Sequence, residues 1–363
     1  MKKLLITTGG GDCPGLNAVI RAIVKSAYSD GNWEVYGSMD GFEGVLNDPP
    51  NMIELSLEKV AGIHVKGGTI LHTSNTKNPL NYPIKQVDGK WQYEDISDLL
   101  VQKLKGFGCD GVINIGGDGS QRISDVLSKK GIPVIGVPKT IDNDLLGTDY
   151  TFGFQTAVQT ATESLDKLVT TADSHHRVMV MEVMGREAGW IALHTAMASG
   201  AEVCLIPEIP YSIDKIVTRI QARYAVGKGF ATIVIAEGAK PINGTVVASL
   251  GSLHSEHVRL GGVAFTLAQQ LKEHGCTAEI RETVLGHVQR GGTPIAFDRY
   301  LATLFGVKAF ELVQSSDFGK MVAIRGNKIV SIPFQEVTNS TKKIEVDGFE
   351  IQAAKTIGIS FGD

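Results

Sequence analysis

The chain has 363 residues, of which 35 are Lys or Arg and 39 are Asp or Glu, so its formal net charge is −4. This length is enough for a sizeable core and predicts two domains. The slightly acidic balance argues against a nucleic-acid partner, and no run reaches the roughly 18 apolar residues of a membrane span.

The first residues, MKKLLITTGGGD, contain only a short apolar run. We interpret them as a first strand rather than as a signal peptide. The four cysteines (Cys13, Cys109, Cys204 and Cys276) lie far apart and lack the spacing of a metal site. We therefore expect free thiols and a cytoplasmic protein.

Short apolar strands alternate with helical patterns along the chain. Residues 3–6 form the first predicted strand, and residues 16–28 follow as a helix with apolar positions at i, i+3 and i+4. Further strands are predicted at 111–115, 132–137, 178–183 and 231–236. Their nearly continuous apolar character is typical of parallel strands buried on both faces, so we predict a doubly wound α/β fold. The polar stretch 72–98 is expected to lie on the surface.

Unusual loops directly follow the predicted strands, at residues 7–15, 116–120, 138–144, 184–189 and 237–240. In doubly wound sheets, ligands bind beyond the carboxyl ends of the strands. The positions of these loops therefore predict an active site.

The first loop, TTGGGDCPG, joins a strand to a helix. It is not a Walker loop, because Leu16 and Asn17 stand where Lys and Ser or Thr would follow. It also departs from the dinucleotide fingerprint, since Pro14 occupies the position of the last glycine. Two interpretations remain open: a phosphate-binding loop, or a tight turn with Pro14 near the helix start.

The second loop is Gly116-Gly117-Asp118-Gly119-Ser120, at the end of an apolar strand. Glycines let the backbone approach a ligand closely, and a lone carboxylate among them suits a metal ion. We therefore predict a site for phosphate and magnesium. NAD kinases and lipid kinases carry a very similar loop, which indicates phosphoryl transfer without naming the substrate. The alternative is a glycine turn capped by Asp118.

Two carboxylates, Asp142 and Asp144, follow the next strand within PKTIDNDL. If the chain is extended there, both lie on one side. One could accept a proton from an attacking hydroxyl while the other helps to hold magnesium. The alternative is a helix N-cap cluster, because Thr140, Asp142 and Asn143 all cap well.

Basic residues mark two later loops. Arg186, in EVMGREAGWIAL, lies at a predicted strand-to-helix junction, where a guanidinium suits phosphate or transition-state charge. The alternative is a surface ion pair. His287 and Arg290 lie in GHVQRGG, with Arg281 six residues before His287. Taken alone, these basic residues would indicate little.

Taken together and in this order, the motifs resemble the phosphofructokinase family, from GGDCPGLNA through GGDGS, KTIDND, SHHR, MGR and AEG to GHVQRGG. The resemblance implies phosphoryl transfer, with Mg²⁺, to the 1-hydroxyl of fructose 6-phosphate in glycolysis. It also implies two doubly wound domains with the active site in the cleft between them. The donor domain would comprise residues 1–153 and about 290–325, and the sugar-phosphate domain 154–289 and about 326–363.

The resemblance also implies roles for individual residues. The donor phosphates would be lined by Gly11, Gly117, Asp118, Gly119 and Ser120, with Asp118 on magnesium. Asp142 would accept the proton, beside Lys139, Thr140 and Asp144, and Arg186 would stabilise the transferring group. Sugar-phosphate contacts would come from Met184, Gly185, Glu237, His287 and Arg290. Arg177 and Arg281 would arrive from a neighbouring subunit, which implies a homotetramer or homodimer with shared active sites.

Some positions depart from the family's common pattern. After GGT, where an arginine commonly faces the donor, the chain has His72, Asn75 and Thr76, with Lys77 the only nearby cation. The bacterial effector site looks incomplete, because Arg21 and Lys25 are present but Val169 stands about where a basic residue is usual.

Two positions bear on the donor. Pyrophosphate-using relatives typically carry aspartate at 119 and lysine at 139, and common ATP-using bacterial relatives carry glycine at both. This chain combines Gly119 with Lys139. An aspartate would crowd and repel the α-phosphate of ATP, whereas glycine leaves that space open, so we predict ATP, with a pyrophosphate-dependent enzyme as the alternative.

Two further alternatives belong to other functional classes. A catalytically silent regulatory subunit is disfavoured by the presence of Asp118, Asp142, Asp144 and Arg186. A kinase of the NAD or lipid type is disfavoured by KTIDND and GHVQRGG.

Overall fold

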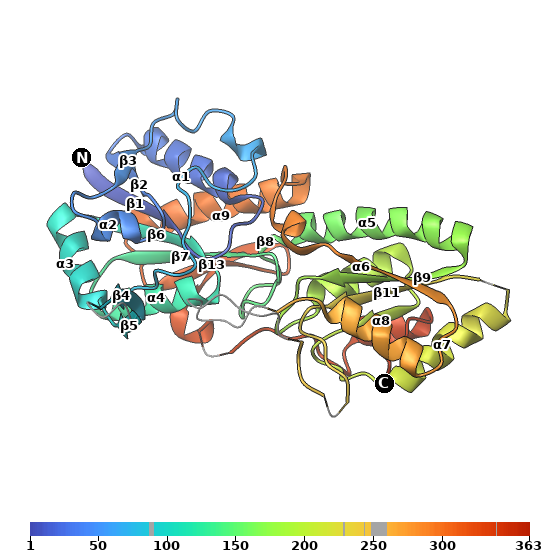
Figure 1. Cartoon of the computed structure of the whole chain (residues 1–363). Coiled ribbons are helices and arrows are strands. Elements are labelled where there is room, and N and C mark those ends of the chain that lie inside the picture. Colours follow the sequence, from blue (N-terminus) through green and yellow to red (C-terminus); the bar gives the residue numbers. More distant parts are fainter. Residues whose placement is uncertain (87–90, 228, 243, 248–259, 339) are drawn as a thin grey trace. The chain divides into compact units, whose positions relative to one another are not determined.

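The computed structural model describes residues 1–86, 91–227, 229–242, 244–247, 260–338 and 340–363 (Figure 1). It divides into two compact units. The first comprises Met1–Ile141, Leu145–Gln155 and Arg290–Ser340, and the second Asp142–Asp144, Thr156–Gln289 and Thr341–Asp363. The chain last passes from the first unit to the second after Ser340, whereas the expected boundary was near residue 325. The reason is that β14 (Lys328–Pro333) pairs with β13 (Lys320–Arg325) and stays in the first unit's sheet.

The first unit is built on a mixed sheet in the order β14-β13-β7-β6-β1-β2-β3, with β8 (Phe152–Gly153) beside β7. Its parallel strands are β1 (Lys2–Thr8), β2 (Trp33–Ser38), β6 (Gly111–Gly116), β7 (Val134–Thr140) and β13. β14 and β3 (Met52–Glu54) close the edges in antiparallel orientation. The strands predicted at 3–6, 111–115 and 132–137 are confirmed, although β7 starts later and continues to Thr140.

Helices cover both faces of this sheet (Figure 1). α1 (Leu16–Asp30) packs along α9 (Ala296–Gln314), and α3 (Ser97–Phe107) and α4 (Asp118–Lys129) lie on the opposite face. Leu5, Val112 and Val134 of the strands share one core cluster with Leu104 of α3 and Leu127 of α4. α1 confirms the helix predicted at residues 16–28. The remaining short helices are α2 (Glu43–Leu46), η1 (Ile63–Val65) and η3 (Phe334–Glu336).

The second unit contains a parallel sheet in the order β10-β11-β9-β12. Its strands are β9 (Arg177–Val183), β10 (Val203–Leu205), β11 (Ala231–Ala236) and β12 (Glu279–Val284). The strands predicted at 178–183 and 231–236 are confirmed. The helices are α5 (Phe154–His175), α6 (Trp190–Ser199), α7 (Ile213–Ala225), α8 (Val263–Glu273) and α10 (Phe349–Thr356). Val178, Val180 and Ile233 pack with Ile216 of α7 and Leu267 of α8 in one core.

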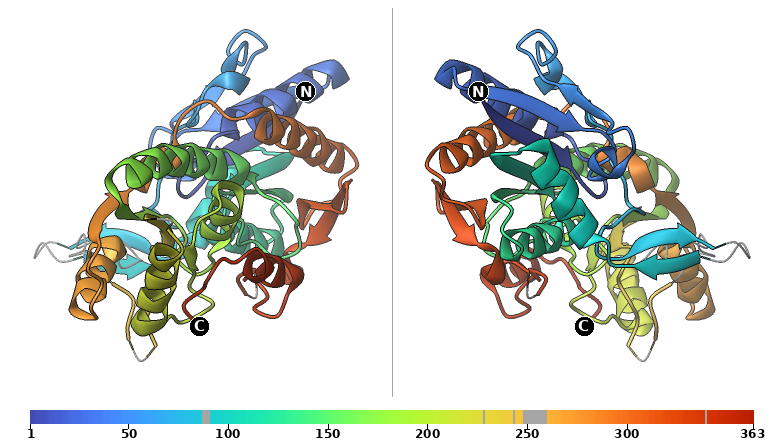
Figure 2. Two further views of the ribbon diagram at one scale, coloured as in Figure 1. Left: turned by 90° about the vertical axis from the view of Figure 1, so that its right-hand side faces the viewer. Right: turned by 90° about the vertical axis from the view of Figure 1, so that its left-hand side faces the viewer.

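The polar stretch 72–98 contains an antiparallel hairpin of β4 (Tyr82–Lys85) and β5 (Trp91–Glu94). Every residue of β5 is exposed, so this part of the chain lies on the surface as expected (Figure 2). Searching the described residues for a helix both long and apolar enough to cross a membrane yields none. The four cysteines are free thiols. Burial raises the pKa of Cys109 to about 11, so this thiol is protonated at neutral pH.

Candidate active site

The first unit brings two glycine loops together at a switch in strand order. The chain runs from β1 to β2 on one side, and β6 then lies on the other side of β1. In an open α/β sheet, such a switch point leaves a crevice beyond the strand ends where ligands bind. Here the loops after β1 and β6 meet, and Gly9 N donates a hydrogen bond to Ile115 O at 2.9 Å.

Glycine is required where these loops touch. A Cβ added at Gly9 would lie 2.6 Å from Ser120 Oγ, and one added at Gly116 would overlap the Ser120 side chain. Asp118 is the first residue of α4 and Gly117 its N-cap, so the alternative in which Asp118 caps a glycine turn is wrong. The exposed N–H groups and the dipole at this helix start favour a bound phosphate.

Asp118 is accessible for a metal ion. Its side chain is 36% exposed and pairs with Arg122 at 2.7 Å across one helical turn. Such an exposed pair is weak and can open when a cation arrives. The described residues hold no group of three or more His, Cys, Asp or Glu side chains arranged for a metal. Mg²⁺ usually takes only one or two carboxylates and completes its shell with substrate phosphates and water, so a single carboxylate fits it.

Two cations flank the first glycine loop. Lys139, at the end of β7, is only 4% exposed, and its Nζ donates a hydrogen bond to Gly11 O. Arg290 Nη1 donates to Asp12 O at 3.3 Å and would lie 2.8 Å from a Cβ on Gly11. The structure thus places Arg290 in the first unit beside the loop after β1. Thr140, next to Lys139, is buried, and its carbonyl oxygen accepts a hydrogen bond from Thr151 at 2.7 Å.

The segment after GGT is tied to the same glycine loop. Thr73 Oγ1 donates to Gly10 O at 2.5 Å, and Gly10 N donates to Ser74 O at 3.3 Å. Asn17 of α1 holds the start of this segment: its side-chain amide donates to Lys66 O at 3.1 Å and accepts from Ile70 N at 2.9 Å. Asn17 is a positioning residue that the sequence interpretation missed.

Lys77, the cation in the segment after GGT, pairs with a residue of α2. Its Nζ pairs with Glu43 at 2.5 Å, and Glu43 also accepts a hydrogen bond from Tyr82 at 2.8 Å. Burial and the Glu43 carboxylate raise the pKa of Tyr82 to about 12. Lys77 therefore stabilises the start of the surface hairpin. His72 and Asn75 are exposed, and His72 has a positive φ of 54°.

The TIDND segment departs from the extended form considered above. Asn143 has a φ of 52°, so Asp142 and Asp144 are not on one side of an extended chain. The helix-cap alternative is also wrong, because the next elements among the described residues are β8 and then α5, which starts at Phe154. Asp142–Asp144 belong to the second unit, where Lys342 N donates a hydrogen bond to Asp144 O at 2.8 Å.

The second unit has its own switch in strand order. The chain passes from β9 to β10 and β11 on one side, and β12 then lies on the other side of β9. The loops after β9 and β11 are joined, because Glu237 N donates to Val183 O at 2.9 Å and Gly238 N donates to Gly185 O at 3.0 Å. A Cβ at Gly238 would clash with Arg186 O. Arg186 and Glu237 are thus presented by two loops fixed to each other.

The loop after β12 joins the same group. Gln289, fully buried in η2 (Gly286–Arg290), accepts a hydrogen bond from Met184 N at 3.2 Å and donates to Gly286 O at 3.0 Å. This amide links the loop that carries His287, itself exposed, to the loop that carries Gly185. The sequence interpretation missed Gln289, although its place inside GHVQRGG was a usable signal.

Arg177 and Arg281 lie on strands of the same sheet, before the loops that follow the strands. Arg177 begins β9, Arg281 lies in β12, and both contact Glu279. They are separated along the strands from the loops that carry Arg186 and His287. That Arg177 and Arg281 serve a neighbouring subunit stays a prediction.

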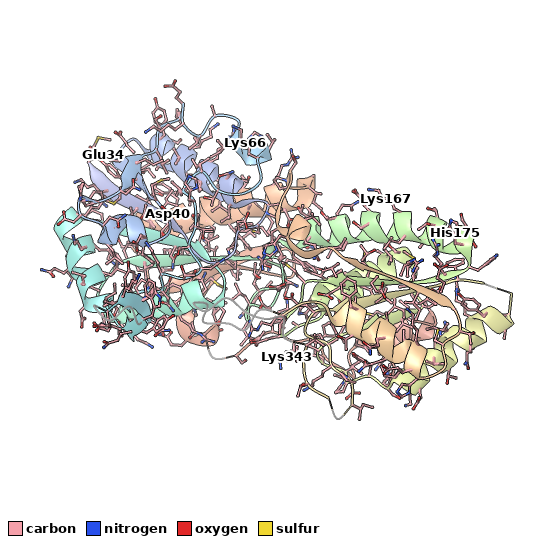
Figure 3. All side chains as sticks on the ribbon, viewed as in Figure 1. Glu34, Asp40, Lys66, Lys167, His175 and Lys343 are labelled. Carbon is pink, nitrogen blue, oxygen red and sulfur yellow. The ribbon has the colours of Figure 1, made fainter. Side chains whose placement is uncertain are left out.

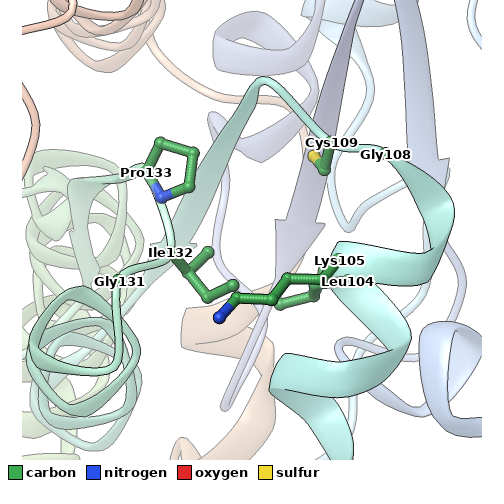
Figure 4. Close-up of a pocket in the computed structure, with 7 residues that line it drawn as sticks. All are labelled: Leu104, Lys105, Gly108, Cys109, Gly131, Ile132 and Pro133. Carbon is green, nitrogen blue, oxygen red and sulfur yellow. The ribbon is translucent and has the colours of Figure 1, made fainter.

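A small pocket elsewhere in the first unit is not part of this set. It is lined by Leu104, Lys105, Gly108, Cys109, Gly131, Ile132 and Pro133 (Figure 4). These residues precede β6 and β7, so the pocket lies at the amino ends of the strands. The glycine loops follow the opposite, carboxyl ends.

Comparisons with a family model, with curated relatives and with solved structures all indicate the same family. A family model described as phosphofructokinase matches residues 3–313. The chain is 50% identical, over 100% of its length and 99% of the relative, to an ATP-dependent 6-phosphofructokinase 2 of Clostridium perfringens. It is 46% identical, over 99% of its length and 100% of the relative, to a pyrophosphate–fructose 6-phosphate 1-phosphotransferase of Streptomyces coelicolor. A solved phosphofructokinase from Saccharomyces cerevisiae matches with a TM-score of 0.78 and 30% identity, over 98% of this chain and 47% of that one.

Proposed function

Since the chain belongs to the phosphofructokinase family, we propose that it transfers a phosphoryl group from ATP to the 1-hydroxyl of fructose 6-phosphate. The products are ADP and fructose 1,6-bisphosphate, so the enzyme acts in glycolysis. The observation that carries this proposal is the pair of glycine loops that meet beyond β1 and β6, next to the buried cation Lys139.

The donor phosphates bind where backbone amides and positive charge converge. Gly11, Gly117 and Ser120 would line the donor phosphates, and the start of α4 adds its dipole. Lys139 brings a positive charge to the same loop. Asp118 would hold Mg²⁺, which when bound neutralises charge on the donor phosphates.

The acceptor side needs a base and a cation for the transferred group. Asp142 accepts the proton of the 1-hydroxyl. The hydroxyl oxygen forms a bond to the γ-phosphorus, while the bond from the γ-phosphorus to the bridging oxygen of the β-phosphate breaks. Arg186 offsets the negative charge on the phosphoryl oxygens. Asp144 and Thr140 flank the base, while Met184, Gly185, Glu237 and His287 contact the sugar phosphate. Arg290 is a further contact of the sugar phosphate.

Gly119 supports ATP rather than pyrophosphate as the donor. A Cβ added at Gly119 would meet no atom within 4 Å, so the start of α4 leaves open space there. That space can take the α-phosphate of ATP. Lys139 is compatible with either donor, because an ammonium group pairs with any phosphate. Use of pyrophosphate is the alternative, and the Streptomyces coelicolor relative bears that name.

The enzyme is a homo-oligomer, a tetramer or dimer, whose subunits share active sites. Arg281 is 55% exposed on β12, an edge strand, and Val284 and Val288 further along are also exposed. Charged and apolar side chains on an edge suit contact with a second copy. Two inactive variants, Arg177→Ala and Asp142→Asn, should recover activity when their subunits are mixed and exchanged. Hybrid oligomers that form and stay inactive would place the arginines in their own chain's site.

A coupled assay tests the reaction itself. Fructose 6-phosphate and Mg²⁺ are supplied first with ATP and then with pyrophosphate, and release of fructose 1,6-bisphosphate is followed. We expect turnover with ATP and little with pyrophosphate. Turnover with pyrophosphate alone would reverse the donor assignment, and no turnover with either would indicate a silent regulatory subunit. The free thiols support a cytoplasmic location.

A further inference from the structure

Three charged residues of the second unit share one face of its sheet. Glu279 opens β12 and is the register partner of Arg177, which opens β9. Arg281 lies two residues beyond Glu279, and alternate residues of a strand point to the same side. Ile280, between them, is only 1% exposed and belongs to the core, so the charged side chains face away from it.

The Glu279 carboxylate bridges the two guanidinium groups. Arg177 Nε donates to Glu279 Oε2 at 2.9 Å, and Arg281 Nη2 contacts Oε1. Each carboxylate oxygen therefore holds one arginine by one edge. The bond to Arg177 uses only Nε, so it does not engage the two Nη nitrogens, which are the donors that suit a phosphate.

The local charge balance stays positive. The hydrogen bond from Arg177 is the main cause of a lowered pKa at Glu279, with smaller contributions from Arg281 and His175, so the carboxylate is ionised at neutral pH. His175 lies at the end of α5 (Figure 3). Two arginines against one glutamate leave one net positive charge. A phosphate dianion is therefore attracted to this cluster.

We propose that Glu279 is a positioning residue that holds Arg177 and Arg281 side by side, so that both guanidinium groups bind the phosphate of the sugar phosphate together. This inference rests on the proposed function. Without the carboxylate, two like charges on adjacent strands repel each other, and two long side chains must be ordered at the moment of binding. With it, the pair is arranged beforehand, which strengthens binding.

If Glu279 instead competed with phosphate, its removal would change the KM in the opposite direction. A carboxylate that competes with phosphate for the arginines would weaken substrate binding, and its removal would lower the KM for fructose 6-phosphate. The edge-on contact through Arg177 Nε favours positioning over competition. Kinetics of one conservative variant can separate the two roles.

The test is Glu279→Gln, which keeps the size of the side chain and removes its charge. We expect the KM for fructose 6-phosphate to rise by about tenfold, the lower end for losing a charge-assisted hydrogen bond, with kcat and the KM for ATP little changed. Glu279→Asp retains the charge and should give an intermediate KM. Glu273→Gln, an exposed residue at the end of α8, is the matched control and should leave both constants as they are.

Suppose that Glu279→Gln unfolds normally and its KM for fructose 6-phosphate is unchanged or lower. That result would overturn the proposed role of Glu279 but not the proposed function. A wild-type protein without turnover would instead overturn the proposed function. Calorimetric titration of both proteins with inorganic phosphate then still decides the inference. Weaker binding by the variant supports positioning, and equal or tighter binding refutes it.

Discussion

Lys139 donates a hydrogen bond from its Nζ to the carbonyl oxygen of Gly11, which joins the end of β7 to the glycine loop after β1. Burying a charged lysine is costly unless the charge meets partners. The carbonyl oxygen of Gly11 is one such partner, and the phosphates of a bound donor would be others. The relationship therefore indicates a cation that is fixed in place before the donor binds.

Lys139→Met should weaken use of the donor while preserving the fold. Methionine fills a similar volume without charge, so the packing around β7 is kept. Loss of a charge-assisted contact to a phosphate corresponds to a fall in kcat/KM for the donor on the order of 10- to 100-fold. Steady-state kinetics with varied ATP measure this, and thermal unfolding serves as the control. Wild-type kcat/KM would mean that Lys139 only braces the Gly11 loop.

Asp142→Asn should fold normally and lose most of its turnover. Asparagine keeps the shape of the side chain but cannot take up the proton of the 1-hydroxyl. Removal of a general base typically costs on the order of 10² to 10⁴ in rate. The measurement is kcat at saturating ATP and fructose 6-phosphate, with binding of fructose 6-phosphate followed by calorimetry. Near-normal turnover in a folded variant would remove Asp142 from the role of base.

Glu208 makes the stability of the second unit depend on pH. Its carboxylate accepts hydrogen bonds from Gly189 N at 3.1 Å, at the start of α6, and from Ile344 N at 3.0 Å. Burial nevertheless raises the pKa of Glu208 above its ordinary value of 4.5, only partly opposed by these bonds and by Lys343, labelled in Figure 3. The folded state thus binds this proton more tightly than the unfolded chain. The resulting stabilisation is present below pH 4.5 and is lost as the pH rises through the raised pKa.

Glu208→Gln should remove this dependence. The difference in Tm between the variant and the wild type should move in favour of the variant as the pH rises from about 4.5 to 7.5, because only the wild type loses a proton there. Other titrating groups contribute equally to both proteins and cancel. A Tm difference that is flat with pH would show that Glu208 titrates normally.

The strands that carry the motifs could be predicted because they are apolar and end in loops rich in glycine and charge. β9 and β11 are buried on every position or nearly so, and Arg186 and Glu237 follow them directly. β12 was missed for the opposite reason. It is an edge strand, so Glu279 and Arg281 alternate with buried Ile280, and its sequence lacks a continuous apolar run.

Contacts between distant segments could not be predicted from local patterns. Asn17 looks like an ordinary helix residue, yet its amide holds Ile70, more than 50 residues further along the chain. Lys77 follows the GGT segment in sequence, but its partner Glu43 lies 34 residues before it. The turn at Asn143 was within reach, because asparagine is one of the few residues that adopt a positive φ readily.

A matched pair of glycine substitutions can test the donor without disturbing the fold. Gly119 is the second residue of α4, and Gly106 lies near the end of α3. A Cβ at either position would meet no atom within 4 Å, and neither glycine has a positive φ. Aspartate at either site therefore adds the same charge to the first unit without a clash. Gly106→Asp is the control, since α3 carries none of the donor residues.

Gly119→Asp should impair ATP use selectively. The new carboxylate would stand at the start of α4, beside Asp118, where the proposed donor phosphates bind, and would repel the α-phosphate as well as occupy its space. Pyrophosphate has only the transferred phosphate and the leaving phosphate, and nothing that corresponds to the α-phosphate of ATP. Its use should therefore be impaired less. We expect the KM for ATP to rise on the order of tenfold or more, as for two like charges brought close together. The KM for fructose 6-phosphate should match that of Gly106→Asp. Equal kinetics with ATP in the two variants would show that the space at Gly119 does not receive the donor, and the choice of ATP would then rest on other residues.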